Sequence, residues 1–264
     1  MATSLLHPAQ NFIGKTFVIT EFELRKLRHD YTELFTRAIQ PALWLLLFGE
    51  TLSHARFLPD GNVPYLDFIA PGILAQSVMF VAIFYGISVI WERDTGIVHK
   101  FLASPAPREA LVLGKGISAG VRSLSQAAII YLLSLLIGVK LNWHPLALLN
   151  VLAISLLAAI LFSTFSLLIA CIVKTRERFM GIGQVMTMPL FFASNAIYPI
   201  AIMPAWLRFF SHLNPLTYIV DALRSVMIAG NVSSFGLGED YAVIILVGIA
   251  LNLACARIYP RLVQ

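Results

Sequence analysis

The charged residues most able to do chemistry form one polar loop, residues 91–105, between two long apolar stretches. The loop opens with Glu92 and Arg93, whose opposite charges suit ion pairing and the docking of a protein partner better than bond-making. Pro105 and Pro107 end any helix that starts there. The loop therefore predicts a short charged helix whose apolar edge enters a groove on a partner. That edge contains Ile97, Phe101 and Leu102.

Motifs for bond-making chemistry are absent from the sequence. The two Gly-Lys pairs, which end at Lys15 and Lys115, lack the complete pattern of a phosphate-cradling loop. The six histidines show no metal-ligand spacing, and no nucleophile elbow occurs. The adjacent carboxylates Glu239 and Asp240 stand at the start of an apolar stretch, where a solvated helix cap is the simplest role. We expect no enzyme, no metal and no cofactor site in this chain.

The composition requires lipid around most of the chain. Of the 264 residues, 58% are hydrophobic and only 12% are charged, and the mean hydropathy is +0.80. Soluble domains carry roughly 25% charged residues, so this chain cannot cover a globular surface in water. Its net charge of +5 fits the basic loops of a membrane protein. No basic stripe interleaved with aromatic residues indicates nucleic acid.

Six stretches approach the roughly 20 apolar residues that a membrane helix needs. The first, residues 34–54, is the weakest because Arg37, Pro41 and Glu50 interrupt it. We therefore expect an all-α integral membrane protein with six transmembrane helices in a single domain, residues 1–264. The other five stretches are residues 68–91, 123–139, 146–173, 179–196 and 241–259.

Two segments outside these spans have their own patterns. Residues 11–31 combine one apolar helical face with scattered charges, which predicts an amphipathic helix in the membrane interface, either a mechanical lever or a passive anchor. Residues 198–224 contain prolines and aromatic residues, which favour short helices that re-enter the outer leaflet, with an ordinary external loop as the alternative. Within them, Asp221 and Arg224 form either a local ion pair or two separate surface charges.

The distribution of basic residues predicts the orientation. Fifteen of the 19 Lys and Arg residues lie on the side of the two termini, and four lie on the other. Cytoplasmic loops carry this excess, so both termini are expected in the cytoplasm of a multi-pass protein of the plasma (inner) membrane.

Several motifs, in order along the chain, resemble those of the permeases of bacterial ABC exporters. The resemblance is to the type-2 group that exports daunorubicin-like drugs, nodulation lipo-oligosaccharides and polysaccharides. One departure is Ile97-Val98, where many relatives carry a pair with an acidic residue. The matching residues in the first loop are Glu92-Arg93-Asp94-Thr95-Gly96, Leu102, Ser104-Pro105, Arg108 and Gly114-Lys115. Further along the chain they are Asn195 to Pro199, Met203-Pro204, Asn214-Pro215-Leu216-Thr217-Tyr218 and Asp221-Ala222-Leu223-Arg224.

This resemblance implies a coupling helix at about residues 92–104 that presses into a groove on a separate ATP-binding cassette ATPase. Two ATPase copies would hold the ATP and Mg²⁺, and this chain would pair with a second permease copy or a paralogue. The cargo would be a drug, a lipid or a lipid-linked glycan, with polysaccharide export as the alternative. A membrane enzyme or an ATP-independent channel is less consistent with a docking loop. The implied coupling positions are Glu92, Arg93, Thr95, Gly96, Leu102 and Ser104, and those of the re-entrant element are Asn214, Pro215, Tyr218, Asp221 and Arg224.

Overall fold

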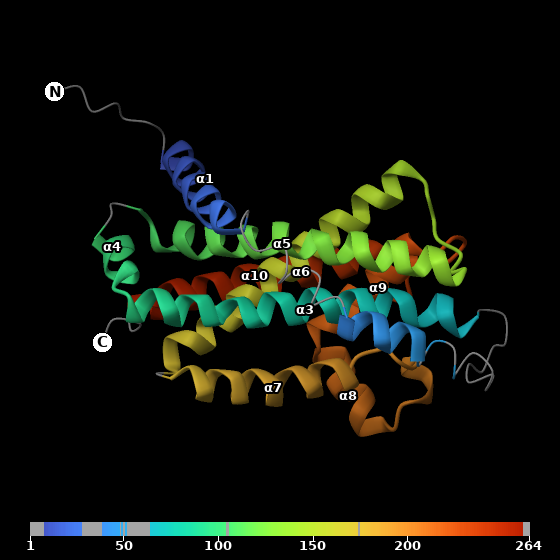
Figure 1. Cartoon of the computed structure of the whole chain (residues 1–264). Coiled ribbons are helices and arrows are strands. Elements are labelled where there is room, and N and C mark those ends of the chain that lie inside the picture. The colour runs from blue at the N-terminus through green and yellow to red at the C-terminus, as the bar shows by residue number, and fades with distance from the viewer. Residues whose placement is uncertain are drawn as a thin grey trace.

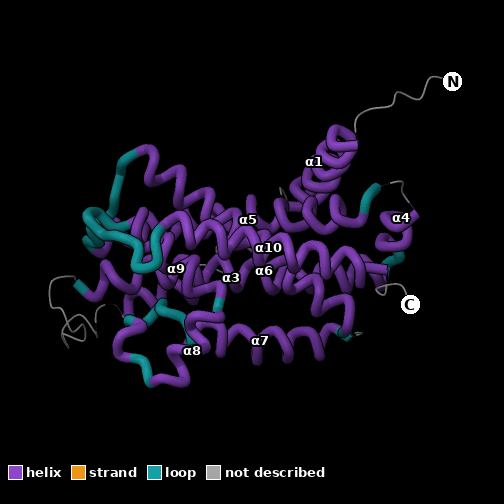
Figure 2. The backbone as a smooth tube through the Cα atoms, turned by 180° about the vertical axis from the view of Figure 1, so that it is seen from behind, coloured by secondary structure: helices purple, strands orange, loops and turns teal. Residues whose placement is uncertain are grey.

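The fold was analysed in a computed structural model that describes residues 8–27, 39–47, 49, 51, 64–103, 106–173 and 175–260. Within these residues the chain forms helices joined by short connections (Figure 2). The described residues also contain one isolated antiparallel β-bridge, between Leu141 and Ile228. The all-helical fold predicted from the sequence is therefore confirmed for the described part of the chain.

Four helices of the described residues are long and apolar enough to cross a membrane. They are α3 (Tyr65–Asp94), α5 (Arg108–Ile137), α6 (Pro145–Ile172) and α10 (Leu237–Ile258). The fifth predicted span corresponds to α7 (Arg176–Phe192), which has 17 residues. Of the first predicted span, residues 39–47 are helical, and most of its remainder lies outside the described residues. The count of six spans therefore stays a prediction.

Helix α5 begins well before the predicted span of residues 123–139. Its first residue, Arg108, follows Pro107, whose fixed φ suits the position just before a helix. The sequence pattern excluded this half of α5 because it contains Lys115 and Arg122. Both charges have partners inside the fold: Lys115 is ion-paired, and the Arg122 guanidinium lies 5.1 Å from the centre of the Tyr85 ring. Paired charges are tolerated within a long helix.

The segment after α7 is a series of short helices. Helix α7 ends at Phe192 and not at Ala196 as predicted, and just beyond its end the Ser194 hydroxyl donates to the Phe191 carbonyl. The predicted re-entrant residues 198–224 form η1 (Ile200–Ile202), α8 (Ala205–Leu213) and most of α9 (Pro215–Met227).

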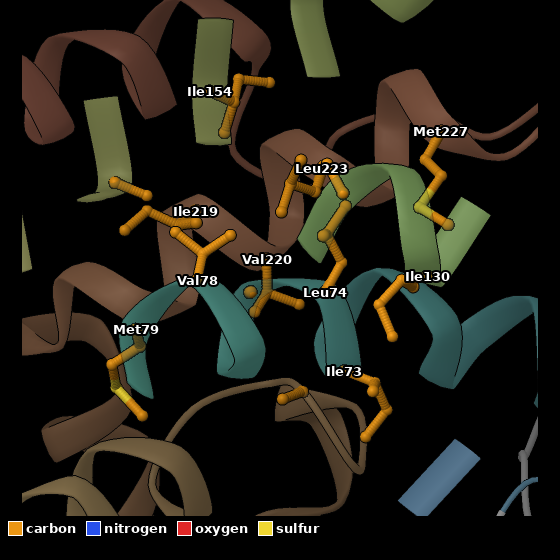
Figure 3. Packing of buried hydrophobic residues seen from close by; sticks show 14 of the residues in the cluster. Ile73, Leu74, Val78, Met79, Ile130, Ile154, Ile219, Val220, Leu223 and Met227 are labelled. Atoms are coloured by element: carbon orange, nitrogen blue, oxygen red, sulfur yellow. The ribbon is translucent and has the colours of Figure 1, made fainter. Parts of the chain in front are cut away.

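The main hydrophobic core lies where α3, α5, α6 and α9 meet (Figure 3). Helix α9 packs against α3, α6 and α10, so this short helix is central to the bundle. Its apolar face lies opposite that of α3, as the labelled side chains show. The core includes Ile73, Leu74, Val78 and Met79 of α3, Ile130 of α5, Ile154 of α6, and Ile219, Val220, Leu223 and Met227 of α9.

The outer helices lie at opposite ends of the bundle (Figures 1 and 2). Helix α1 (Pro8–Leu27) and helix α4 (Ile97–Ala103) lie at the end where α10 finishes, whereas α8 lies at the opposite end beside α7. Helix α1 packs on α5 through Thr16, Ile19 and Thr20, while Ile13 and Phe17 of the predicted apolar face are exposed. An exposed apolar face suits contact with lipid. Residues 28–31 of the predicted helix lie outside the described part.

The carboxylate pair before the last long helix does not form a solvated cap as predicted. Asp240 is fully buried, and its Oδ2 accepts a hydrogen bond of 2.8 Å from the hydroxyl of Ser233, while Glu239 is exposed. Asp240 faces inward because Ser233 lies in the turn that precedes α10 and supplies a donor there.

Candidate functional site

The predicted coupling residues lie at the end of α3 and not in one continuous helix over 92–104. Glu92 and Arg93 belong to the last turn of α3. This helix ends at Asp94, and α4 starts at Ile97. The break occurs at Thr95, whose hydroxyl donates to the Trp91 carbonyl at 2.9 Å, and at Gly96, whose φ of +75° favours glycine. The side chain of Leu102 and all of Ser104 lie outside the described residues.

A buried ion cluster connects this turn to two other helices. The Lys115 ammonium on α5 lies 2.5 Å from a carboxylate oxygen of Glu92 on α3 and 2.8 Å from one of Glu23 on α1. Their side chains are at most 5% exposed. The Tyr85 hydroxyl of α3 donates to the second oxygen of Glu23 at 2.7 Å. The three helices are therefore joined through one ammonium group.

The electrostatics of this cluster depend on Lys115. Two buried carboxylates share one ammonium, and removing a partner from a buried pair leaves an uncompensated charge. The phenol of Tyr259, just beyond α10, is also buried there. The arrangement is suited to holding helices together, and it presents no exposed reactive group.

Helix α4 packs part of its apolar surface inward, and Ile97 and Phe101 of the predicted edge are half-buried, while the Leu102 side chain lies outside the described residues. Val98 is fully buried, and the ring of Phe101 lies edge-on to that of Phe22 on α1, with 5.7 Å between the ring centres. This packing occurs because α1 and α5 already provide an apolar surface under α4. The outward face instead carries His99 and Lys100, both exposed. A partner would meet polar and basic groups there.

A second set of contacts links the end of α3 to the start of α7. The Asp94 carboxylate pairs with Arg93 and with Arg176, each at 3.0 Å. The Arg176 guanidinium also lies 3.3 Å from the centre of the exposed Trp91 ring. These groups are partly exposed, so each pair contributes little stability on its own. Their geometry nevertheless places basic, acidic and aromatic groups on one surface beside α4.

The motif that begins at Asn214 builds the junction between α8 and α9. The Asn214 side chain accepts from the amide of Leu216 at 3.0 Å, as a helix cap does, and it donates to the Leu190 carbonyl of α7 at 2.6 Å. Pro215 occupies the first turn, where its missing N–H costs nothing. The Tyr218 hydroxyl donates to the His212 carbonyl at 2.9 Å and so closes the turn back onto α8.

Asp221 and Arg224 are neither an ion pair with each other nor surface charges, so both sequence-based alternatives are wrong. Both side chains are buried, and no salt bridge joins these two residues in the structure. Asp221 instead accepts hydrogen bonds from the amides of Ser234 and Phe235. Arg224 donates to the carbonyls of Phe68 and Asn195, the latter at 2.8 Å. Each charged side chain therefore holds α9 to neighbouring segments through hydrogen bonds to their backbone.

Sequence reasoning missed two members of the buried cluster. Lys115 was read only as part of a Gly-Lys motif, and Glu23 was not singled out. A signal for Glu23 existed, because Thr16, Thr20 and Glu23 recur at helical spacing and form a polar stripe on α1. The structure buries that stripe against α5, where the Thr20 hydroxyl reaches the Gly114 carbonyl at 3.2 Å.

Comparison with known proteins identifies the family. The family model described as the ABC-2 type transporter matches residues 15–228. The chain belongs to this family. It is 30% identical over 215 residues to a transport permease named ycf38 of Cyanophora paradoxa, covering 81% of this chain and 74% of that one. It is also 23% identical to the daunorubicin resistance ABC transporter permease protein DrrB1 of Streptomyces coeruleorubidus, covering 76% and 70% of the two chains.

A third similar protein covers more of both chains. The inner membrane transport permease YadH of Escherichia coli (strain K12) is 22% identical over 244 residues, covering 88% of this chain and 91% of that one. Together with the long apolar helices, these matches make this ABC-2 chain a membrane transport permease. The family resemblance inferred from the loop and the Asn214 motif is thereby confirmed.

Proposed function

We propose that this ABC-2 permease is the membrane-spanning subunit of an ATP-driven exporter and that α4 transmits motion from a separate ATPase chain. The observation that carries the proposal is the position of α4. It connects the ends of two long helices, packs on α1 and lies next to the buried Lys115 cluster. A force on α4 therefore acts on α3, α5 and α1 together.

The outward face of α4 supports contact with an ATPase. His99 and Lys100 are exposed there, and Asp94 and Trp91 lie on the adjoining turn of α3. Charged and aromatic groups of this kind set the register of a docked partner. We infer that Arg93, Thr95 and Gly96 act as a hinge beside this face, and that Glu92 acts from inside the fold through Lys115.

The proposal includes the surroundings of the chain. The distribution of Lys and Arg supports a plasma (inner) membrane protein with both termini on the cytoplasmic side, the side of α1 and α4. A second permease copy or paralogue would complete the transport path, two ATPase subunits would supply ATP and Mg²⁺, and η1, α8 and α9 would form the re-entrant element. A drug, a lipid or a lipid-linked glycan would be exported, or a polysaccharide in the alternative.

Charge reversal at the exposed face of α4 tests the coupling. The variant Lys100→Glu is compared with Lys140→Glu, which changes another exposed lysine at the opposite end of the bundle. Each is co-purified with a candidate ATP-binding cassette ATPase of the same organism, and ATP hydrolysis is measured in lipid. We expect Lys100→Glu to weaken the complex about tenfold and Lys140→Glu to leave it intact. Equal behaviour of the two variants, or a wild-type chain that never alters ATP hydrolysis, would contradict the proposal.

A further inference from the structure

An apolar groove lies where α5 and α10 run side by side, with α6 and the first half of α1 as its other walls (Figures 1 and 2). It has a volume of about 420 Å³, and its lining is mostly aliphatic. Helix α10 supplies most of that lining, and only 17% of the apolar stretch of α10 is buried in the fold, against 78% for α3. The groove therefore opens toward the surroundings of the bundle.

The length of the groove matches the depth of one membrane leaflet. Its lining on α10 extends from Ile244 to Leu253, nine positions, which is about 14 Å along the helix. The hydrocarbon core of a bilayer is about 30 Å thick, so one leaflet is about 15 Å deep. A hydrocarbon chain in the groove therefore reaches from near the end of α10 to about the middle of the membrane.

Gly248 keeps the groove open. This glycine lines the groove, and a Cβ there would meet no atom of another segment within 4 Å. No close packing contact of the described residues therefore explains why glycine stands at this position. A larger side chain would project into the groove and reduce its volume. The glycine thus suits an occupant that lies directly against the backbone of α10.

The end of the groove toward the chain termini is basic. Arg108 begins α5 beside Glu109 of the lining, and both side chains are exposed. The exposed Arg257 lies one turn beyond the lining on α10, and the half-buried Lys15 lies one turn beyond it on α1. Three cations therefore surround one carboxylate. A Lys or Arg near the membrane surface contributes about 1 kcal/mol to the binding of anionic lipid, so an anionic headgroup is favoured at this end.

We propose that the groove binds one anionic phospholipid, with an acyl chain along α10 and its phosphate between Arg108 and Arg257. The lipid touches α1, α5, α6 and α10 together. It therefore helps to hold α1 against the bundle, and α1 carries Glu23 of the buried ion cluster. The headgroup lies in the leaflet on the side of α1 and α4.

Photolabelling of the full chain in nanodiscs of phosphatidylcholine, without any ATPase, tests the proposal. The probe is phosphatidylglycerol with a photoreactive group midway along one acyl chain, and its counterpart is phosphatidylcholine with the same labelled chain. Only the headgroup differs between the two. We expect saturable labelling of the peptide that contains Gly248 and Leu253, about tenfold stronger by the phosphatidylglycerol probe because of the basic residues at the groove.

Two pairs of variants make the test specific. Gly248→Leu fills the groove and should reduce labelling about tenfold, whereas Gly238→Leu, in equally open surroundings outside the lining, should leave it unchanged. Arg257→Gln should lower the preference for phosphatidylglycerol about fivefold, and Arg178→Gln, which changes an exposed arginine at the start of α7, should not.

Three results would overturn the proposal. Equal labelling by the two probes would exclude a site for an anionic headgroup. Labelling that is indifferent to Gly248→Leu would show that the lipid does not lie in the groove. Absence of labelling by either probe would indicate that another occupant, such as a second copy of this chain, covers it. Since no ATPase is present, each of these results would leave the coupling experiment unaffected.

Discussion

Replacing Lys115 by methionine should destabilise the fold more than any single change at the exposed surface. The ammonium is shared by Glu23 and Glu92 at 2.8 and 2.5 Å, and all three side chains are almost completely buried. Breaking a buried ion pair by removing one partner costs roughly 3–5 kcal/mol, because the remaining charge keeps its desolvation penalty. Here two carboxylates lose the same partner, so we expect a loss at the upper end of that range.

Neutralising the whole cluster should reverse most of this loss. In the triple variant Glu23→Gln, Glu92→Gln, Lys115→Met, no buried charge of the cluster remains, and Tyr85 can still donate to the amide at position 23. Replacement of a complete buried ion cluster by well-packed hydrophobic residues is often close to neutral for stability, and buried neutral amides cost less than two buried carboxylates that have lost their ammonium partner. The triple variant should therefore be more stable than Lys115→Met alone, although it carries more substitutions.

The free energy of unfolding can be compared in mixed micelles titrated with a denaturing detergent. Arg25→Met serves as the control, since Arg25 pairs with Glu21 on the exposed surface of α1. We expect that control to stay near the wild type. A Lys115→Met chain that is destabilised by less than about 1 kcal/mol, or a triple variant that is no more stable than Lys115→Met, would refute the electrostatic reasoning.

Three further changes test other parts of the molecule. Gly72→Ala should destabilise by about 1–3 kcal/mol in the same titration, because a Cβ there would lie 2.4 Å from a backbone carbonyl oxygen, whereas Gly181→Ala, with no atom within 4 Å, should not. Asn214→Ala removes the α9 cap and a bond to α7, so it should cost about 1–2 kcal/mol and raise protease sensitivity between α8 and α9. Glu23→Gln should lower ATPase stimulation by the assembled transporter, and the exposed neighbour Glu21→Gln should not; equal effects would contradict a role for the buried cluster.

The long apolar helices were predictable because twenty apolar residues in a row have few alternatives to a membrane. The early start of α5 was not, because Lys115 appears as an interruption until its partners on α1 and α3 are known. Those partners are 92 and 23 residues away in sequence, beyond the reach of any local pattern. The sequence predicted that α1 is amphipathic from its apolar face. It did not show that the opposite face, which carries Thr16 and Thr20, packs on α5.

In the candidate site, too, some features depend on neighbouring residues in the sequence and others depend on distant ones. The break at Gly96 and the cap at Asn214 depend on neighbouring residues and lie within the matched motifs, but the sequence analysis predicted a helix through Gly96 and no cap at Asn214. The roles of Asp221 and Arg224 depend on which segments α9 meets in space, and three-residue spacing on a helix suggested a pair that the fold does not form. Spacing shows which side chains can meet, and burial decides which of them must find other partners.

The position of Glu23 bears on whether α1 is a lever or an anchor. A passive anchor needs only the exposed apolar face that Ile13 and Phe17 provide. It has no need for a carboxylate buried against the end of α3, since such a group costs stability unless its partner is held in place. Glu23 and Glu92 share Lys115, and Phe22 packs on Phe101 of α4. Because the first contact ties α1 to α5 and the second ties it to α4, α1 cannot shift without disturbing both, as the proposed lever requires.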